Sequence, residues 1–241
     1  MCDACGCSSG TEGLPARKKI DVKKSLLDAN DRQAAVNREH LESMGAVALN
    51  LISSPGAGKT TLLEQTIMRV GNRWRIGVLE GDIETERDAD RIRRHGIPAV
   101  QITTGGACHL DAPLVHRALH QLEEQGRGKG FDLVFIENVG NLVCPAAFRL
   151  GEHLKVVILS VPEGSDKPAK YPRAFIDSDL FIISKIDLVE HFDFSMDEAE
   201  HEARRLNPDL EITRLSAVSG ENLDEWIDFL ERAVTEYAGQ R

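Results

Sequence analysis

Short apolar runs alternate with amphipathic stretches along most of the chain. The first run spans residues 46–52, and the later ones, rich in Val, Ile and Leu, lie at 75–80, 98–103, 132–137, 155–161, 179–184 and 211–216. Short runs that are apolar throughout are typical of strands buried on both faces of a parallel sheet. Apolar residues at helical spacing lie between most of them, at about 59–70, 85–95, 110–125, 196–206 and 221–237. We therefore predict an α/β fold with a mostly parallel β-sheet and helices on both faces.

The N-terminal residues have a different pattern. Residues 1–20 are rich in Cys, Gly and Ser and then basic, which predicts a flexible N-terminal metal-binding segment. Residues 21–45 carry apolar residues at loose helical spacing and end on Gly45, so we expect an N-terminal helix there. The α/β domain is then predicted to span residues 46–241.

The segment 53–61 reads Ser-Ser-Pro-Gly-Ala-Gly-Lys-Thr-Thr and lies between the first predicted strand and a predicted helix. The backbone N–H groups of such a loop and the dipole of the following helix form a binding site for phosphate. Lys59 is placed to reach the β- and γ-phosphates, and the Thr60 hydroxyl is placed to ligate Mg²⁺. Ser53 stands where this motif usually begins with glycine. The motif predicts that residues 46–241 form a P-loop domain, whose phosphate-binding residues are Gly56, Ala57, Gly58, Lys59, Thr60 and Thr61.

Acidic residues stand at the carboxyl ends of two predicted strands, which is where parallel sheets bind their ligands. Asp82 follows the strand at 75–80, and Glu137 ends the strand at 132–137. Together with Thr60, either carboxylate suits Mg²⁺, which prefers oxygen ligands; for Asp82 the alternative is a cap on the following helix. Further candidates near the phosphates are Glu84 and Asp88. Neither a catalytic Gln nor an arginine finger is evident, so hydrolysis is expected to be slow, with the predicted catalytic residues Lys59, Asp82 and Glu137.

The element Ser184-Lys185-Ile186-Asp187 follows a predicted strand and resembles the one by which GTPases recognise guanine. The Asp187 carboxylate accepts hydrogen bonds from guanine N1–H and the exocyclic amine, a pair of donors that adenine lacks. The Lys185 side chain is expected to cover one face of the base. Ser216-Ala217 resembles the later element whose backbone N–H contacts guanine O6. Ser184 replaces the usual Asn or Thr, which we expect to weaken the bracing of this loop. These elements predict that the nucleotide is GTP.

Three residues beyond the predicted strand ends have the chemistry of transition-metal ligands. Cys108 and His109 follow the strand at 98–103, and Cys144 follows the strand at 132–137. Two thiolates and an imidazole suit Zn²⁺ or Ni²⁺, with a remaining ligand from water or a second subunit. The alternative is a pair of buried free thiols, which cysteines commonly are.

A second cysteine group lies at the N-terminus. Cys2, Cys5 and Cys7, together with the terminal amine, offer an S₃N ligand set for Ni²⁺, for which Zn²⁺ and copper would compete. The alternative is an unstructured reactive tail. Apart from His109, the histidines are expected to be mostly ordinary helix or surface residues: His40, His95, His116, His120, His153, His191 and His201.

Charge and composition narrow the class of partner. The chain has 241 residues with 29 basic and 39 acidic groups, a formal net charge of −10, which disfavours nucleic acid and anionic membranes as partners. No run reaches the roughly 20 apolar residues that span a bilayer, and the sequence does not open on an apolar signal region. We therefore expect a cytoplasmic protein whose five cysteines are thiols or metal ligands.

Together these motifs resemble those of the HypB family of hydrogenase maturation GTPases. The resemblance is carried by residues 2–7, 53–61, 80–87, 105–110, 137–145, 166–172 and 184–187. It implies a slow GTPase of the SIMIBI class that assists nickel insertion into [NiFe]-hydrogenase. It also implies a nickel site at the N-terminal cysteines and a weaker Ni/Zn site of Cys108, His109 and Cys144 at the interface of a nucleotide-dependent homodimer. The implied partners are a HypA-like accessory protein and the precursor of the hydrogenase large subunit.

Three functions remain open at this point. The chain is a GTP-gated nickel metallochaperone for hydrogenase, a GTPase accessory protein for urease or a cobalamin mutase, or a passive nickel-binding protein. The loops after Asp82, at Cys108 and at Cys144 leave neighbouring strand ends, so nucleotide is expected to influence the metal ligands. The segment 166–172 is expected to be a loop in which Lys167 or Lys170 reaches phosphate or is simply solvated.

Overall fold

The computed structural model describes residues 16–82 and 87–238. The predicted ligands Cys2, Cys5 and Cys7 therefore lie outside the described residues, and so does Glu84. None of the helices in these two ranges combines the length and the apolar character that crossing a bilayer requires.

The strands form one seven-stranded sheet in the order β3-β2-β4-β1-β5-β6-β7, and all of its pairings are parallel. The strands are β1 Val47–Ser53, β2 Ile76–Asp82, β3 Ala99–Thr103, β4 Leu133–Glu137, β5 Leu154–Ser160, β6 Leu180–Ser184 and β7 Glu211–Leu215. Every predicted apolar run is a strand, which confirms the α/β fold class. The strand order places β1, and with it the phosphate-binding loop, in the middle of the sheet.

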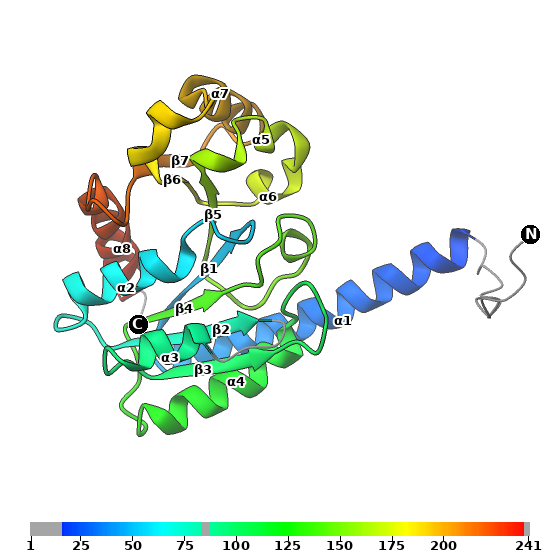
Figure 1. Ribbon diagram of the computed structural model, residues 1–241. Helices are drawn as coiled ribbons and strands as arrows, with labels where there is room; N and C mark the ends of the chain where they lie inside the picture. The colour runs from blue at the N-terminus through cyan, green and yellow to red at the C-terminus, as the bar shows by residue number, and fades with distance from the viewer. Residues whose placement is uncertain (1–15, 83–86, 239–241) are drawn as a thin grey trace, which may run out of the picture.

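Helices cover both faces of the sheet, and α1 extends beyond the body of the protein (Figure 1). They are α1 Ala16–Ser43, α2 Lys59–Val70, α3 Arg87–Arg93, α4 Ala112–Gln125, α5 Lys167–Lys170, α6 Pro172–Ile176, α7 Met196–Leu206 and α8 Leu223–Ala238. Because successive strand residues point to opposite faces, Leu49 and Leu51 share a core with α2, α3 and α8. Ala48 faces the other way and shares a core with α1 and α4. Ile52, on the same face as Ala48, packs with α6 and α7.

Local signals explain most helix boundaries. The helix predicted from residue 21 begins earlier, at Ala16, and ends at Ser43, where Gly45 reverses the chain with a φ of 79°. The α4 helix begins after Asp111, because its side chain caps the helix by accepting a hydrogen bond from Leu114 N at 2.8 Å. Short 3₁₀ helices follow three strands, at Pro145–Ala147, Val161–Glu163 and Ile186–His191.

The prediction of a loop over 166–172 is wrong, because this segment contains α5 and the start of α6. Pro168 and Pro172 lie in the first turn of these helices, where the missing N–H has no helical partner to lose. The prolines thus begin helices here. Lys167 and Lys170 both pair with Asp166 in the structure.

Candidate nucleotide and metal sites

The phosphate-binding loop lies between the end of β1 and the start of α2. Gly58 precedes the helix with a φ of 99°, which favours glycine because other side chains rarely adopt a positive φ. Lys59 Nζ donates a hydrogen bond to Ser53 Oγ at 2.9 Å. The serine that replaces the first glycine of the motif thus holds the lysine in place. A cavity of about 470 Å³ opens over this loop and is lined by residues 55–56, 58–61, 81–82, 88, 91, 137–140 and 185.

Two buried carboxylates lie side by side beneath this cavity. Glu80 of β2 and Glu137 of β4 are partners in the parallel register, with exposed fractions of 2% and 5%. Thr60 Oγ1 donates to Glu137 Oε1 at 2.9 Å, and Lys59 Nζ lies 4.0 Å from the same oxygen. Burial and the charge of Glu137 raise the pKa of Glu80 well above its ordinary value. Burial also raises the pKa of Glu137, although Lys59 opposes that shift. Burial thus opposes a negative charge on both carboxylates at once, whereas Lys59 favours the charged form of Glu137.

The predicted magnesium ligands all line the cavity. They are Thr60, Asp82 and Glu137, and Asp88 lines it as well. A hydroxyl and carboxylates fit Mg²⁺, and Glu137 Oε2 is a buried oxygen without a hydrogen-bond partner in the structure.

Arg91 also lines the cavity, and sequence reasoning missed it. Its guanidinium donates to Glu64 Oε2 at 2.6 Å and to Thr61 Oγ1 at 3.5 Å, so it is held beside α2. These bonds to Glu64 raise the pKa of Arg91. The signal that would have found it is a cationic residue on the helix that follows Asp82.

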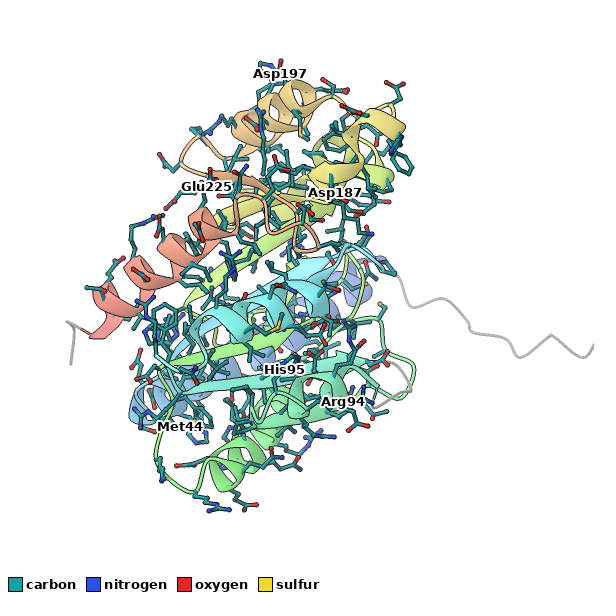
Figure 2. All side chains as sticks on the ribbon, turned by 60° about the vertical axis from the view of Figure 1, so that its left-hand side comes forward. Met44, Arg94, His95, Asp187, Asp197 and Glu225 are labelled. Carbon is teal, nitrogen blue, oxygen red and sulfur yellow. The ribbon has the colours of Figure 1, made fainter. Side chains whose placement is uncertain are left out.

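The residues predicted to bind the base brace the phosphate-binding loop. Lys185 adopts a left-handed conformation, with a φ of 59°, and its Nζ donates to Gly56 O at 2.6 Å. Ser184 Oγ donates to Ala57 O at 2.7 Å. The serine thus still braces the loop, although it replaces the usual Asn or Thr. Asp187 is exposed in the first turn of the 3₁₀ helix that follows, and it is labelled in Figure 2.

Ser216 and Ala217 follow β7, the neighbour of β6, so they stand at the same edge of the sheet as Lys185. Ser216 is buried, and its Oγ accepts a hydrogen bond from Ser219 N at 3.1 Å, which shapes the loop. The positions predicted for the base thus follow two adjoining strands, and although β5 separates β6 from β1, Ser184 and Lys185 contact the phosphate-binding loop directly.

Cys108, His109 and Cys144 come together as predicted, with one ligand atom of each within 4.8 Å of the other two. All three residues are half-buried. The His109 ring stacks on Phe148, with 4.2 Å between ring centroids, and burial lowers the pKa of His109. A neutral imidazole beside two thiols is the form that binds a metal ion. This donor set fits Zn²⁺ or Ni²⁺ and leaves room for a fourth ligand.

A hydrogen-bonded asparagine joins the two sites. Asn138 follows Glu137 and is 1% exposed, and its Oδ1 accepts from Leu110 N at 3.2 Å, directly after His109. Two residues further on, Gly140 packs so closely on the phosphate-binding loop that a Cβ would meet Pro55 Cα at 2.9 Å. The segment from Glu137 to Cys144 thus contacts both the nucleotide cavity and the metal loop. Sequence reasoning quoted this segment but did not single out Asn138 or Gly140.

Three of the histidines expected to be ordinary helix or surface residues do lie on helices, but they also lie close together. One ring nitrogen of each of His40, His116 and His120 is within 4.8 Å of the other two. Helices α1 and α4, far apart in the sequence, bring them together.

Comparison with known proteins assigns the family. The sequence profile for the CobW/HypB/UreG nucleotide-binding domain matches residues 47–214. The hydrogenase maturation factor HypB of Azotobacter chroococcum mcd 1 is 51% identical over 220 residues, which cover 91% of this chain and 71% of that protein. The chain belongs to the HypB family. A HypB described as a hydrogenase/urease maturation factor, from Helicobacter pylori, is 41% identical over 89% of this chain and 88% of its own length.

The HypB fold is confirmed by a solved structure. The crystal structure of HypB from Helicobacter pylori in complex with nickel superposes with a TM-score of 0.83 and 42% identity, and covers 86% of this chain and 96% of that one. The resemblance noted in the sequence is therefore confirmed for the family and for the nucleotide-binding fold.

Proposed function

We propose that the protein is a GTP-hydrolysing nickel metallochaperone that assists nickel insertion into [NiFe]-hydrogenase. The observation that carries this proposal is the shared segment: residues 137–140 line the nucleotide cavity, and Cys144 closes the thiol and imidazole cluster. The names of the HypB relatives support hydrogenase as the client, and the nickel complex of a relative supports nickel as the cargo.

Phosphate binding begins with Lys59. Its ammonium group rests on Ser53 Oγ and near Glu137, both of which are weaker partners than a triphosphate. When GTP enters, Lys59 turns to the β- and γ-phosphates, while the N–H groups of Gly56, Ala57 and Gly58 and of the first turn of α2 surround the β-phosphate. Positive charge from Lys59 and the helix N-terminus stabilises the charge that develops as the γ-phosphate leaves.

Thr60, Asp82 and Glu137 would hold Mg²⁺, which when bound neutralises charge on the β- and γ-phosphates. The raised pKa of Glu80 opposes a second negative charge beside Glu137. No glutamine lines the cavity among the described residues, so we expect slow hydrolysis of GTP to GDP and phosphate, as in a switch.

Guanine is proposed to bind at the end of β6 and β7. Asp187 accepts from guanine N1–H and the amine, Lys185 covers the base, and the backbone of Ser216 and Ala217 contacts O6. Asp187→Asn tests this, because an amide at this position pairs better with xanthine, which has a carbonyl group in place of the amine. We expect preference to move from GTP to xanthosine triphosphate by about 10³-fold or more. Unchanged GTP affinity would remove Asp187 from the site.

Nickel is proposed to pass from the N-terminal cysteines to the cluster of Cys108, His109 and Cys144, and then to the client. A second copy of the chain would supply the missing ligand in a nucleotide-dependent homodimer. The other partners in this proposal are a HypA-like accessory protein and the hydrogenase large-subunit precursor. The GTP-bound state would order residues 137–144 and thereby change the metal cluster.

The decisive experiment measures Ni²⁺ affinity of the Cys2→Ala, Cys5→Ala, Cys7→Ala variant, loaded either with GDP or with a non-hydrolysable GTP analogue. We expect the two affinities to differ by about 5–150-fold, the usual range for coupled sites. The same background carrying Lys59→Ala is the control, and there the difference should vanish. Equal affinities in the two nucleotide states would favour a passive nickel-binding protein instead.

Maturation of urease is a second candidate, because one HypB relative is named a hydrogenase/urease maturation factor. Complementation of a strain that lacks its own HypB separates the candidates. Restored hydrogenase activity without restored urease activity would support the hydrogenase-specific function, and restored activity of both enzymes would support the broader one.

A further inference from the structure

A group of three histidines lies where α1 packs on α4. His40 comes from α1, and His116 and His120 come from α4, where they are one turn apart and share a face. The two helices run side by side (Figure 1), and the rings of His40 and His120 are 4.6 Å apart between centroids. This cluster contains no cysteine and does not line the nucleotide cavity.

The tautomer of His116 follows from its neighbour Asn37. The Asn37 amide nitrogen donates to Ala112 O and to Leu150 O, each at 2.8 Å. This fixes the amide orientation, so Asn37 Oδ1 is an acceptor, and His116 Nδ1 lies 3.0 Å from it. His116 Nδ1 therefore carries the proton, and Nε2 presents a lone pair toward His120. A buried amide that fixes the ring in this way is typical of the shell around metal-binding histidines.

His40 is held in a comparable way by Glu123. His40 Nε2 lies 3.1 Å from Glu123 Oε2, so the nitrogen donates to the carboxylate. The other ring nitrogen, Nδ1, is buried and has no hydrogen-bond partner in the structure. A buried bare nitrogen costs free energy unless it acquires a partner. A carboxylate behind a histidine is also the arrangement that orients metal ligands and raises their basicity.

The spacing of the ring nitrogens suits an ion. His116 Nε2 and His120 Nε2 lie 3.4 Å apart. A tetrahedral ion with metal–nitrogen bonds of about 2.0–2.1 Å holds its ligand atoms roughly 3.4 Å apart. The pair thus already has the separation of two ligands, and one ring nitrogen of His40 lies within 4.8 Å of both.

We propose that His40, His116 and His120 form a third metal site, which binds a divalent borderline ion, Zn²⁺ or Ni²⁺, with Glu123 and Asn37 orienting the ligands. Three imidazoles suit these ions, whereas Mg²⁺ prefers oxygen. The site fastens α1 to α4 close to Ala112, the first residue of the helix that follows the Cys108 and His109 loop. It stands independently of GTP hydrolysis and of hydrogenase maturation.

The test uses the full chain with all cysteines replaced by serine, so that thiolate sites no longer compete. Equilibrium dialysis with Zn²⁺ alone and, separately, with Ni²⁺ alone is followed by measurement of bound metal. We expect one ion per chain for at least one of the two metals. His120 is exposed, so His120→Gln leaves the fold intact and is expected to weaken binding about 100-fold; Glu123→Gln should weaken it about 10-fold. The matched control is His201→Gln on α7, which should change nothing.

Nucleotide binding by the cysteine-free chain verifies that it is folded. If it is not, the comparison moves to the wild-type chain, where His120→Gln should lower the metal content at saturation by one ion. The proposal is overturned if the folded chain binds neither metal, if His120→Gln binds as tightly as its parent, or if His201→Gln causes the same loss. The metal that binds more tightly identifies the ion.

Discussion

The nucleotide cavity and the cysteine cluster are neighbours, yet they are built differently. The polar groups of the cavity are bonded before any ligand arrives: Lys59 to Ser53 at 2.9 Å, Thr60 to Glu137 at 2.9 Å, and Ser184 to Ala57 at 2.7 Å. The metal cluster lies at the surface, and Cys108 Sγ is 3.8 Å from His109 Nδ1. The cavity is preorganised by the sheet, whereas the cluster depends on two loops.

The two regions should therefore respond differently to substitution. Substitutions in the cavity remove hydrogen bonds that stabilise the folded chain, so they affect both stability and nucleotide binding. Changes in the cluster remove ligands that carry little of the fold, so they affect metal binding alone. Asn138 lines the cavity, and its Oδ1 accepts from Val139 N in the cavity wall and from Leu110 N beside the metal loop, so it is the position at which the regions are expected to communicate.

The largest effect is expected from Lys59→Ala. Loss of a preorganised cation at the phosphates should lower GTP hydrolysis by about 10²–10³-fold. Glu137 would also lose its cationic neighbour, so thermal stability should fall. Turnover and melting temperature are measured beside Lys170→Ala, an exposed lysine on α5 that should leave both unchanged. Wild-type hydrolysis in Lys59→Ala would contradict the site.

Cys108→Ala tests the metal cluster in the same way. In the background without Cys2, Cys5 and Cys7, it should weaken Ni²⁺ and Zn²⁺ binding about 100-fold, because one of three close ligands is lost. Cys108 is only half-buried and lies on a loop, so the free energy of unfolding should change by less than about 1 kcal/mol. Metal titration and urea unfolding check the two statements. Val143→Ala, an exposed neighbour of Cys144, is the control. A large loss of stability would show that the cluster is part of the core.

Asn138→Ala tests whether the two regions communicate through this side chain. The buried N–H groups of Leu110 and Val139 would lose their acceptor, at a cost of about 1–3 kcal/mol in the free energy of unfolding. We also expect the difference in Ni²⁺ affinity between the GDP and GTP-analogue states to shrink to less than about 3-fold. Coupled sites usually differ by about 5–150-fold. Asn141→Ala, half-buried in the same segment and bonded to Val143 N there, should keep that difference. If Asn138→Ala keeps it as well, the communication takes another route.

Local sequence patterns predicted the elements well and their assembly poorly. The strands are short apolar runs because both faces of this sheet are covered. Each strand residue therefore carries the signal of its own burial in the sequence. The phosphate-binding loop and Ser184–Asp187 were predictable because each is contiguous in the sequence. Pro168 and Pro172 misled, since proline begins a helix as readily as it marks a loop.

The features that escaped prediction depend on which elements become neighbours. Glu80 and Glu137 form a pair only because β2 lies beside β4. His40 meets His116 only because α1 packs on α4. Asn138 bonds to Leu110 through the same strand order, which periodicity does not contain. A single sequence holds these residues but not their proximity.

Glu80→Gln gives the smallest effect and tests how tightly the cavity is prearranged. The raised pKa of Glu80, caused by burial and by the charge of Glu137, means that the folded chain holds a proton that the unfolded chain releases more readily. This contribution to stability is fully present below the ordinary value of 4.5 and is lost as pH rises through the raised value. Glutamine stays neutral, so relative to wild type the variant should become more stable with rising pH, by at most about 1.4 kcal/mol per pH unit.

Urea unfolding without nucleotide, at several pH values from 5 to about 8, measures this slope. Glu190→Gln, at an exposed position, is the matched control. Its free energy of unfolding should change with pH in the same way as that of wild type. If the free energy of unfolding of Glu80→Gln also follows that of wild type across this pH range, Glu80 releases its proton as easily in the folded chain as in the unfolded one. A second negative charge then lies beside Glu137. Lys59 would in that case face two negatively charged carboxylates before the triphosphate arrives. The nucleotide-free cavity would then favour binding of a cation over binding of phosphate.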